Sequence, residues 1–194
     1  MQFVNIINKL KRKSGLIVYN QKQNKFILDD EKALAVLLYV LQKVDNLYNI
    51  MKVIYFADKE HLSKYGRFLY GETYIAMTKG QVPSRIYDMI KFVRGDGSVS
   101  FQNKIREMFS VEGKDKIIPK TKPNVGYLSE SDKKVLDKAI EEYGKTHYIN
   151  LFHKSHKDSA YKETELNQEI TLDKIIDSLD NKETVKKYLE NIYR

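Results

Sequence analysis

The chain of 194 residues contains no cysteine and no tryptophan, and only three prolines. Without cysteine it can form no disulfide, no thiolate nucleophile and no Cys-ligated metal site, which fits a reducing compartment. Its longest apolar run, from Ala33 to Leu41, has nine residues, whereas a membrane-spanning helix needs about 20. The N-terminus also lacks the apolar stretch and small-residue cleavage site of a secretory signal. We therefore expect a cytoplasmic protein that makes no contact with membranes.

The common catalytic signatures are absent as well. The chain has no Gly-Lys-Ser/Thr phosphate loop, no His-Glu-x-x-His zinc motif and no Gly-x-Ser-x-Gly nucleophile elbow. Gly95-Asp-Gly97 is only a fragment of a dinucleotide-binding fingerprint, because the third glycine is missing and β-like residues follow. We interpret it as a turn, and we expect no enzymatic activity, no catalytic residue and no cofactor.

Two pairs of polar residues allow other interpretations. His153 and His156 are three positions apart on a predicted helix, so both can face one metal ion if a third ligand comes from nearby. Asp58 and His61 have the same spacing, and a carboxylate can orient an imidazole as in a catalytic dyad. No serine or cysteine nucleophile is visibly associated with this second pair. We expect structural hydrogen bonding from Asp58 and His61, one packed and one surface histidine from the other pair, and no metal.

The formal net charge of +8 is unevenly distributed along the chain. Residues 1–30 carry six Lys or Arg against two Asp, and residues 102–122 carry six against three acidic residues. From Asp158 to the end, nine acidic residues outnumber six basic ones. Such polarity can steer an acidic partner or a nucleic acid. A solvated, Lys-rich surface is the simpler explanation, so charge alone assigns no function.

The chain is sized for one main domain with a small extension, since 42% of its 194 residues are hydrophobic. Residues 1–30 predict the extension, a helix followed by a hairpin of two short β-like runs at 16–19 and 25–28. Residues 31–194 predict the main domain. We expect a mainly α fold of the α+β class, a helical bundle with a small antiparallel β-sheet or hairpins.

Hydrophobic periodicity predicts most of the helices. Residues 32–44 are apolar on nearly every side, which indicates a buried central helix. The next helix is expected to begin at Asn46 or Asn49 and to end at Gly66, where glycine can adopt the left-handed conformation. These two helices should bury each other's faces through Leu37, Leu38, Leu41, Val53, Ile54 and Phe56. Further helices are predicted at 83–94, 129–143, 146–155, 171–179 and 181–192.

Short segments between the helices have β-like or turn-like character. Residues 74–77 alternate like a strand, Gly80 predicts a turn, and Pro83 suits the first turn of a helix. Further β-like pieces lie at 99–101, 108–111 and 116–118. Ser129 with Asp132 predicts a capping box at the start of a helix.

Two separated sets of motifs resemble one known family. The first set comprises Tyr55-Phe-Ala-Asp-Lys-Glu-His-Leu62, Tyr65-Gly-Arg67, Gly71-Glu-Thr-Tyr74 and Gly80-Gln-Val-Pro-Ser84. The second is His156-Lys-Asp-Ser-Ala-Tyr161, far downstream. In this order they resemble the Panacea domain, the family that includes SocA-like antitoxins, over about residues 31–194. The chain has Gln81, Asp158, Ser159 and Tyr161 where the family usually has proline, glutamate, proline and tryptophan.

The resemblance implies an antitoxin that neutralises a cognate toxin protein, typically encoded beside it and often on a prophage. Panacea domains are paired with unrelated toxins, including small alarmone synthetase-like enzymes and other inhibitors of translation. Neutralisation normally means direct protein–protein binding, although SocA-like members act as adaptors that deliver the toxin to a protease. A homodimer and a heterotetramer with the toxin are both left open.

Two alternatives come from other functional classes. A nucleic-acid-binding regulator would use the basic N-terminal third, although a nucleic acid is not the expected partner. A hydrolase would use Asp58 and His61. The antitoxin interpretation agrees better with a folded chain that has no catalytic set.

We place the predicted toxin contact in the region from Gly66 to Tyr87, at Arg67, Tyr70, Lys79 and Arg85. Loops held by a rigid scaffold are common binding sites, and Tyr and Arg are frequent interface anchors. The alternative places the contact in segments 1–30 and 102–122, outside the motifs.

Overall fold

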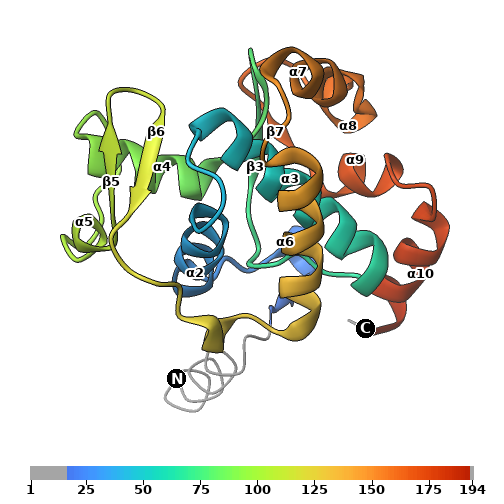
Figure 1. The fold of residues 1–194 in the computed structure, drawn as a ribbon. Helices are drawn as coiled ribbons and strands as arrows, with labels where there is room; N and C mark the ends of the chain where they lie inside the picture. The colour runs from blue at the N-terminus through green and yellow to red at the C-terminus, as the bar shows by residue number, and fades with distance from the viewer. Residues whose placement is uncertain (1–16, 193–194) are drawn as a thin grey trace.

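The structure, a computed structural model, describes residues 17–192, so the helix predicted near the N-terminus lies outside the described residues. Helices dominate and the sheets are small and antiparallel, which confirms the expected fold class (Figure 1). The helices are α2 (Asp30–Leu41), α3 (Leu47–Tyr65), α4 (Ser84–Arg94), α5 (Ile105–Met108), α6 (Glu130–Tyr143), α7 (Tyr148–Lys157), α8 (Ser159–Lys162), α9 (Leu172–Asp177) and α10 (Lys182–Ile192). The strands are β1 (Tyr19–Asn20), β2 (Lys25–Phe26), β3 (Tyr74–Met77), β4 (Gly80–Pro83), β5 (Phe109–Glu112), β6 (Lys116–Pro119) and β7 (Glu169–Ile170). Within residues 17–192, none of the helices has the length and apolar character that a bilayer crossing demands.

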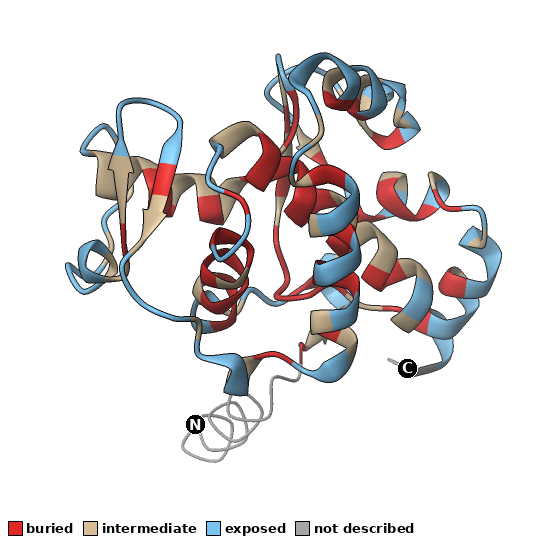
Figure 2. Cartoon of the chain, viewed as in Figure 1, coloured by how far each residue is buried: buried red, intermediate tan, exposed pale blue. Residues whose placement is uncertain are grey.

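The long helix α3 is the centre of the fold. It packs against α2, α6 and α7 and also contacts α9 and α10 (Figure 1). Eleven of its 19 residues are buried, whereas α6 and α10 keep an exposed outer face (Figure 2). The predicted pairing of α2 with α3 is confirmed, since five of the six predicted core residues are buried. The sixth, Phe56, is partly buried, with its ring centroid 4.6 Å from that of Tyr143.

Both ends of α3 follow from local chemistry. The Asn46 side chain accepts hydrogen bonds from the backbone N–H groups of Tyr48 and Asn49, so Asn46 is the N-cap. Asn49, the alternative cap, is buried and instead donates to carbonyls after α6. Gly66 ends the helix with a φ of 65°, and a side chain there would collide with the ring of Tyr188 on α10.

A three-stranded antiparallel sheet, in the order β4–β3–β7, lies beside α3 (Figure 1). Strand β3 has the predicted bounds, but β4 and β7 were not predicted. Gly80 opens β4 after the turn, and Pro83 ends that strand as the N-cap residue of α4, not in the first turn of the helix. Strand β7 has two residues and pairs with β3 from far along the chain, so no local pattern indicates it.

Two hairpins complete the β structure. The predicted N-terminal hairpin is confirmed as β1–β2, and a Cβ on Gly71 would collide with the carbonyl of Ile27 just after it. The second hairpin, β5–β6, is formed by the β-like pieces predicted at 108–111 and 116–118, whose pairing was not predicted. The prediction of a β-like piece at 99–101 is wrong. Its Phe101 instead packs near Phe92, under the guanidinium of Arg85 at 4.3 Å from the ring centroid.

Helix α4 is capped from a distance. Its N-cap residue, Pro83, makes no side-chain cap hydrogen bond. The buried carboxylate of Glu72 accepts hydrogen bonds from the backbone N–H groups of Arg85 (3.1 Å) and Ile86 (3.4 Å). It also accepts from the N–H of Thr73 at 2.8 Å. Burial raises the pKa of Glu72 to about 7, although these hydrogen bonds oppose the shift.

We expect Glu72→Ala to lower the free energy of unfolding by about 2–4 kcal/mol, because the mutation leaves the first N–H groups of α4 buried without an acceptor. Urea unfolding measures this loss. Glu165→Ala, at an exposed position, is the control and should change the free energy by less than about 0.5 kcal/mol. Equal stability of the two variants would show that Glu72 does not cap α4.

Candidate partner-binding cleft

The four residues predicted to contact a partner do not form one surface. The prediction for Tyr70 is wrong, because its side chain is 0% exposed and its hydroxyl donates to Glu72 at 2.9 Å. Arg85 is partly buried and its guanidinium makes two hydrogen bonds to Asp30, at 2.5 and 2.7 Å. Lys79 is exposed in the turn between β3 and β4. Of these three side chains, only that of Lys79 stands free of the fold's own packing.

Arg67 belongs to a buried charge cluster between α3 and the start of α6. The carboxylate of Asp132 contacts Lys32 Nζ at 2.7 Å, His61 Nε2 at 3.0 Å and Arg67 Nη2 at 3.1 Å. Burial acts to raise the pKa of Asp132, but the hydrogen bond from His61 and the charges of Lys32 and Arg67 together hold that pKa well below its usual range. Arg67 therefore stabilises the fold.

Asp58 and His61 serve separate structural connections. Asp58 Oδ1 accepts from the backbone N–H of Leu69 at 2.5 Å, and its Oδ2 accepts from the hydroxyl of Tyr74 at 2.7 Å. Burial raises the pKa of Asp58 to about 7 against these two hydrogen bonds. Asp58 thus ties the chain that follows α3 back onto the helix, and the expectation of structural hydrogen bonding is confirmed.

The surroundings of His61 do not form a catalytic triad. Ser131 Oγ and Asp132 Oδ1 both approach the same ring nitrogen, Nε2, at 3.4 and 3.0 Å. The other nitrogen, Nδ1, contacts the carbonyl of Arg67 at 2.9 Å. In a Ser-His-Asp triad the serine and the aspartate contact opposite nitrogens. This geometry gives no support to the hydrolase alternative.

The pair on α7 behaves as one packed and one surface histidine. The ring of His156 stacks on Phe152 with centroids 3.8 Å apart, and its nitrogens lie near the carbonyls of Phe152 and Thr78. His153 is exposed. Within residues 17–192, no three His, Asp or Glu side chains are arranged to hold a metal ion.

The second motif set fastens the C-terminal helices to the centre of the fold. Asp158 forms an ion pair with Lys59 and accepts a hydrogen bond from the hydroxyl of Tyr55 at 3.0 Å. The hydroxyl of Tyr161 donates to the carbonyl of Met77 at 3.0 Å. Aspartate and tyrosine at these positions therefore make connections between elements.

Gln81 likewise connects two elements. Its amide nitrogen donates to the carbonyl of Ser155 at 3.0 Å, and its amide oxygen accepts from the Ser155 hydroxyl at 2.6 Å. This reciprocal pair joins β4 to α7. A proline at position 81 has no side-chain polar atoms and could not form it.

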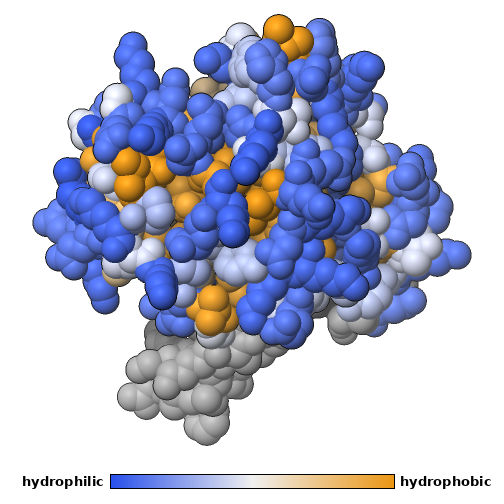
Figure 3. Space-filling model, in the orientation of Figure 1, coloured by the Kyte–Doolittle hydropathy of each residue, from blue (hydrophilic) through white to orange (hydrophobic). Residues whose placement is uncertain are grey.

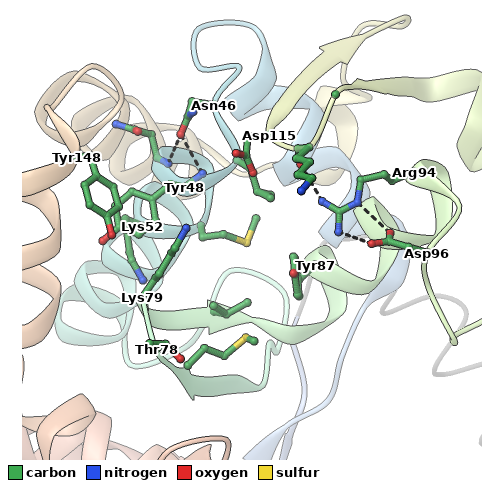
Figure 4. A pocket seen from close by; sticks show the side chains of 17 residues that line it. Asn46, Tyr48, Lys52, Thr78, Lys79, Tyr87, Arg94, Asp96, Asp115 and Tyr148 are labelled. Atoms are coloured by element: carbon green, nitrogen blue, oxygen red, sulfur yellow. Dashed lines mark hydrogen bonds and ion pairs between the residues drawn. The ribbon is translucent and has the colours of Figure 1, made fainter.

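An open cleft of about 1020 Å³ remains, and the connections described above do not fill it. It lies among the start of α3, the β3–β4 turn, α4, the β5–β6 turn and the start of α7 (Figure 4). One wall therefore carries a predicted motif, Gly80-Gln-Val-Pro-Ser84, while the opposite wall comes from segment 102–122, the alternative location of the contact. We call it the basic–aromatic cleft, after its charged residues Lys52, Lys79, Arg94, Asp96, Lys114 and Asp115 and its aromatic residues Tyr48, Tyr87 and Tyr148.

Basic charge predominates in the cleft. Arg94 and Asp96 neutralise each other through two hydrogen bonds, at 2.9 and 2.8 Å (Figure 4). Lys79 and Lys114 come from the two facing hairpin turns. Lys52 and Lys79 lie at the end of the cleft near Tyr48 and Tyr148, away from the Arg94 ion pair (Figure 4).

Lys52 has an unusual environment for a lysine. Its side chain is 1% exposed, and Nζ donates to the carbonyl of Gln81 at 2.7 Å. Burial lowers the pKa of Lys52 to about 7. Gly80, with a φ of 97°, leaves room for the ammonium, since a Cβ there would lie 2.6 Å from Nζ. The Tyr48 ring centroid lies 5.2 Å from Nζ.

The rim of the cleft carries exposed apolar and aromatic side chains. Tyr148 is 42% exposed with its ring 4.7 Å from that of Tyr48, and the neighbouring Ile149 is 53% exposed. Figure 3 shows hydrophobic residues at the α7 end of the molecule, besides a larger hydrophobic area across the middle of the same face. Exposed residues of this kind are typical interface anchors.

Sequence reasoning missed Lys52, Tyr48 and Tyr148. A faint signal was present for Lys52, since a lysine in the run Ile50-Met-Lys-Val-Ile54 occupies a helix face that is otherwise apolar. For the two tyrosines there was none, because a tyrosine on a helix is ordinarily explained by packing.

Comparison with known proteins gives one match. The family described as antitoxin SocA-like, Panacea domain, matches residues 50–162. These residues run from within α3 to the end of α8 and include both hairpin walls of the cleft. Curated proteins and solved structures returned no match.

We expect Asp132→Asn to lower the free energy of unfolding near pH 7 by about 3–5 kcal/mol, because it leaves the buried ammonium of Lys32 and the guanidinium of Arg67 without their carboxylate. The native pKa of Asp132 is lowered, so its contribution is present above the unfolded pKa of about 3.9 and is lost as the pH falls below it. The difference from the wild type should therefore shrink in acid. Asp177→Asn, in an exposed ion pair with Lys186, is the control. A difference that is independent of pH would contradict this account.

Proposed function

Because the chain belongs to the family of SocA-like antitoxins with a Panacea domain, we propose that it neutralises a cognate toxin protein by binding it directly. The observation that carries the proposal is that some polar residues hold the fold together while others line an open cleft. The carboxylates of Asp58, Glu72 and Asp132 bind partners inside the fold, whereas the basic–aromatic cleft retains the charges of Lys79 and Lys114, for which the described residues supply no acidic partner. Such an arrangement suits a binding protein.

We infer that the protein has no enzymatic activity of its own. Asp58, His61 and Asp132 are the polar residues that sequence and structure offer for catalysis. Their hydrogen bonds all lead to neighbouring parts of the fold, and they lie in the interior. A catalytic group must reach its substrate, and these three do not open onto the cleft.

The toxin contact is assigned to the two hairpin turns and the start of α7. Lys79 and Lys114 supply positive charge from opposite walls of the cleft, and Tyr148 with Ile149 supplies exposed anchors at the rim. Of the four contact residues predicted from the sequence, this proposed surface retains only Lys79. The proposed surface also includes part of segment 102–122, so it combines residues of the Gly66–Tyr87 region with residues of one alternative segment.

The resemblance favours a toxin that inhibits translation, with small alarmone synthetase-like enzymes as the reference class, encountered in the cytoplasm. The nucleic-acid alternative gains little support. Within the described part of residues 1–30 the basic side chains are Lys22 and Lys25, and Lys25 is paired with Glu169 at 2.6 Å.

We expect co-expression of this chain to restore growth of cells that express the toxic product of the adjacent gene. The double charge reversal Lys79→Glu with Lys114→Glu should weaken toxin binding by about tenfold or more, because like charges then meet in the interface. Lys182→Glu with Lys187→Glu on α10, outside the cleft, is the matched control and should protect as the wild type does.

The same experiment separates direct binding from proteolytic delivery when the amount of toxin is followed by immunoblot. Direct binding predicts protection at an unchanged toxin level. A toxin level that falls on co-expression and recovers in a protease-deficient host would support the adaptor alternative. Full protection by the cleft variant would move the interface elsewhere.

A further inference from the structure

Lys52 is a buried cation without a carboxylate partner. Its ammonium has three N–H donors, and among the described residues its one hydrogen-bond acceptor is the carbonyl of Gln81, at 2.7 Å. Lys32, which is equally buried, is paired with Asp132. Burial is the cause of the lowered pKa of Lys52, with no acidic neighbour to oppose it. Buried charges in proteins are ordinarily paired with an opposite charge. In the free protein the ammonium of Lys52 has no such partner among the described residues.

A second unsatisfied group lies on the same helix face. Tyr48, four residues before Lys52, also lines the cleft, and its hydroxyl is buried. Among the buried side-chain nitrogen and oxygen atoms of residues 17–192, this hydroxyl alone has no hydrogen-bond partner. Burial raises the pKa of Tyr48 well above its ordinary range, so the hydroxyl stays protonated and can donate. The ammonium and the phenol both call for an acceptor from outside the chain.

The charged and apolar residues that line the cleft favour an acidic protein segment over a free anion as the ligand of Lys52 and Tyr48. Lys79 and Lys114 at the hairpin turns attract negative charge. Apolar residues of the lining, Leu47, Met51 and Val82, suit hydrophobic neighbours on the incoming segment. A carboxylate can accept from two donors at once, since it has two oxygens and no donor of its own.

We propose that the toxin inserts the carboxylate of an aspartate or glutamate side chain into the basic–aromatic cleft, where it pairs with the ammonium of Lys52 and accepts a hydrogen bond from Tyr48. This inference rests on the proposed function and names the chemistry of its interface. The buried charge, unfavourable in the free protein, then acquires its partner only in the complex. Binding of the toxin thereby supplies the carboxylate partner that Lys52 lacks in the free protein.

Proton uptake is a direct consequence. In the free protein Lys52 is partly deprotonated near neutral pH, and a bound carboxylate favours its charged form. Complex formation should therefore take up close to one proton above about pH 8 and much less at about pH 6. Other charged groups in the cleft are Lys79, Lys114, Asp115 and the Arg94–Asp96 pair, and His156 lies against the carbonyl of Thr78 in the β3–β4 turn. These groups are unchanged in Lys52→Met, so the difference in proton uptake between the wild type and this variant removes their contributions.

Isothermal titration of the adjacent gene's product into the full chain, in buffers of different ionisation enthalpy, tests the proposal. Lys52→Met should weaken binding by about 30-fold or more and abolish the pH-dependent proton uptake. The free variant should be as stable as the wild type or more stable, because an apolar side chain replaces an unpaired buried charge. A purely structural lysine would give the reverse pattern, with lower stability and unchanged affinity. Lys187→Met on α10 is the matched control.

The variant Tyr48→Phe decides the matter if Lys52→Met does not fold, since it removes only the hydroxyl. It should weaken toxin binding by about fivefold to tenfold without loss of stability. Wild-type affinity in Tyr48→Phe or in folded Lys52→Met, beside a wild type that neutralises the toxin, would overturn the inference and leave the proposed function standing. A wild type that does not bind the toxin would instead overturn the proposed function. Inorganic phosphate that binds the free chain and blocks the toxin would overturn the assignment to a protein carboxylate.

Discussion

The burial of carboxylates against α3 is the constraint on which the rest of the structure depends. Asp58 holds the chain after the helix through the N–H of Leu69, and Asp132 joins the side chains of Lys32, His61 and Arg67 beneath α6. Glu72, just before β3, caps the neighbouring start of α4. Burial of each carboxylate without a partner would cost free energy. Its burial becomes favourable only when another segment of the chain supplies hydrogen-bond donors. Asp58 and Glu72 belong to the motifs that resemble the family, so these motifs include residues that hold the fold together.

The same constraint separates the polar groups that the fold uses from those that line the cleft. The side chains of Asp58, His61 and Tyr70 are fully buried, and their hydrogen-bond partners lie inside the fold. The basic–aromatic cleft differs because Lys52 keeps an uncompensated charge. Its walls are two hairpin turns, one within a motif and one outside it.

Local signals in the sequence predicted much of the fold. The apolar periodicity of α2 and α3, the cap at Asn46, the stop at Gly66 and the Ser129–Asp132 capping box were all confirmed, because each depends on neighbours within a few residues. Strand β4 was missed because Gly80 was assigned to a turn and Pro83 to a helix, whereas β7 was missed because its partner β3 lies far away along the chain. Tyr70 was misplaced for a similar reason, since burial depends on tertiary packing. The cleft was beyond sequence reasoning because its groups come from segments far apart along the chain.

Hydrogen–deuterium exchange of the chain, alone and with its toxin, tests most directly the claim that the toxin occupies the basic–aromatic cleft. Exchange reports which backbone segments the partner covers. The account predicts slower exchange in the β3–β4 turn, the β5–β6 turn and the start of α7, with α10 unchanged. Protection confined to α9 and α10, or to the segment around Arg67, with the cleft walls unaffected, would contradict it.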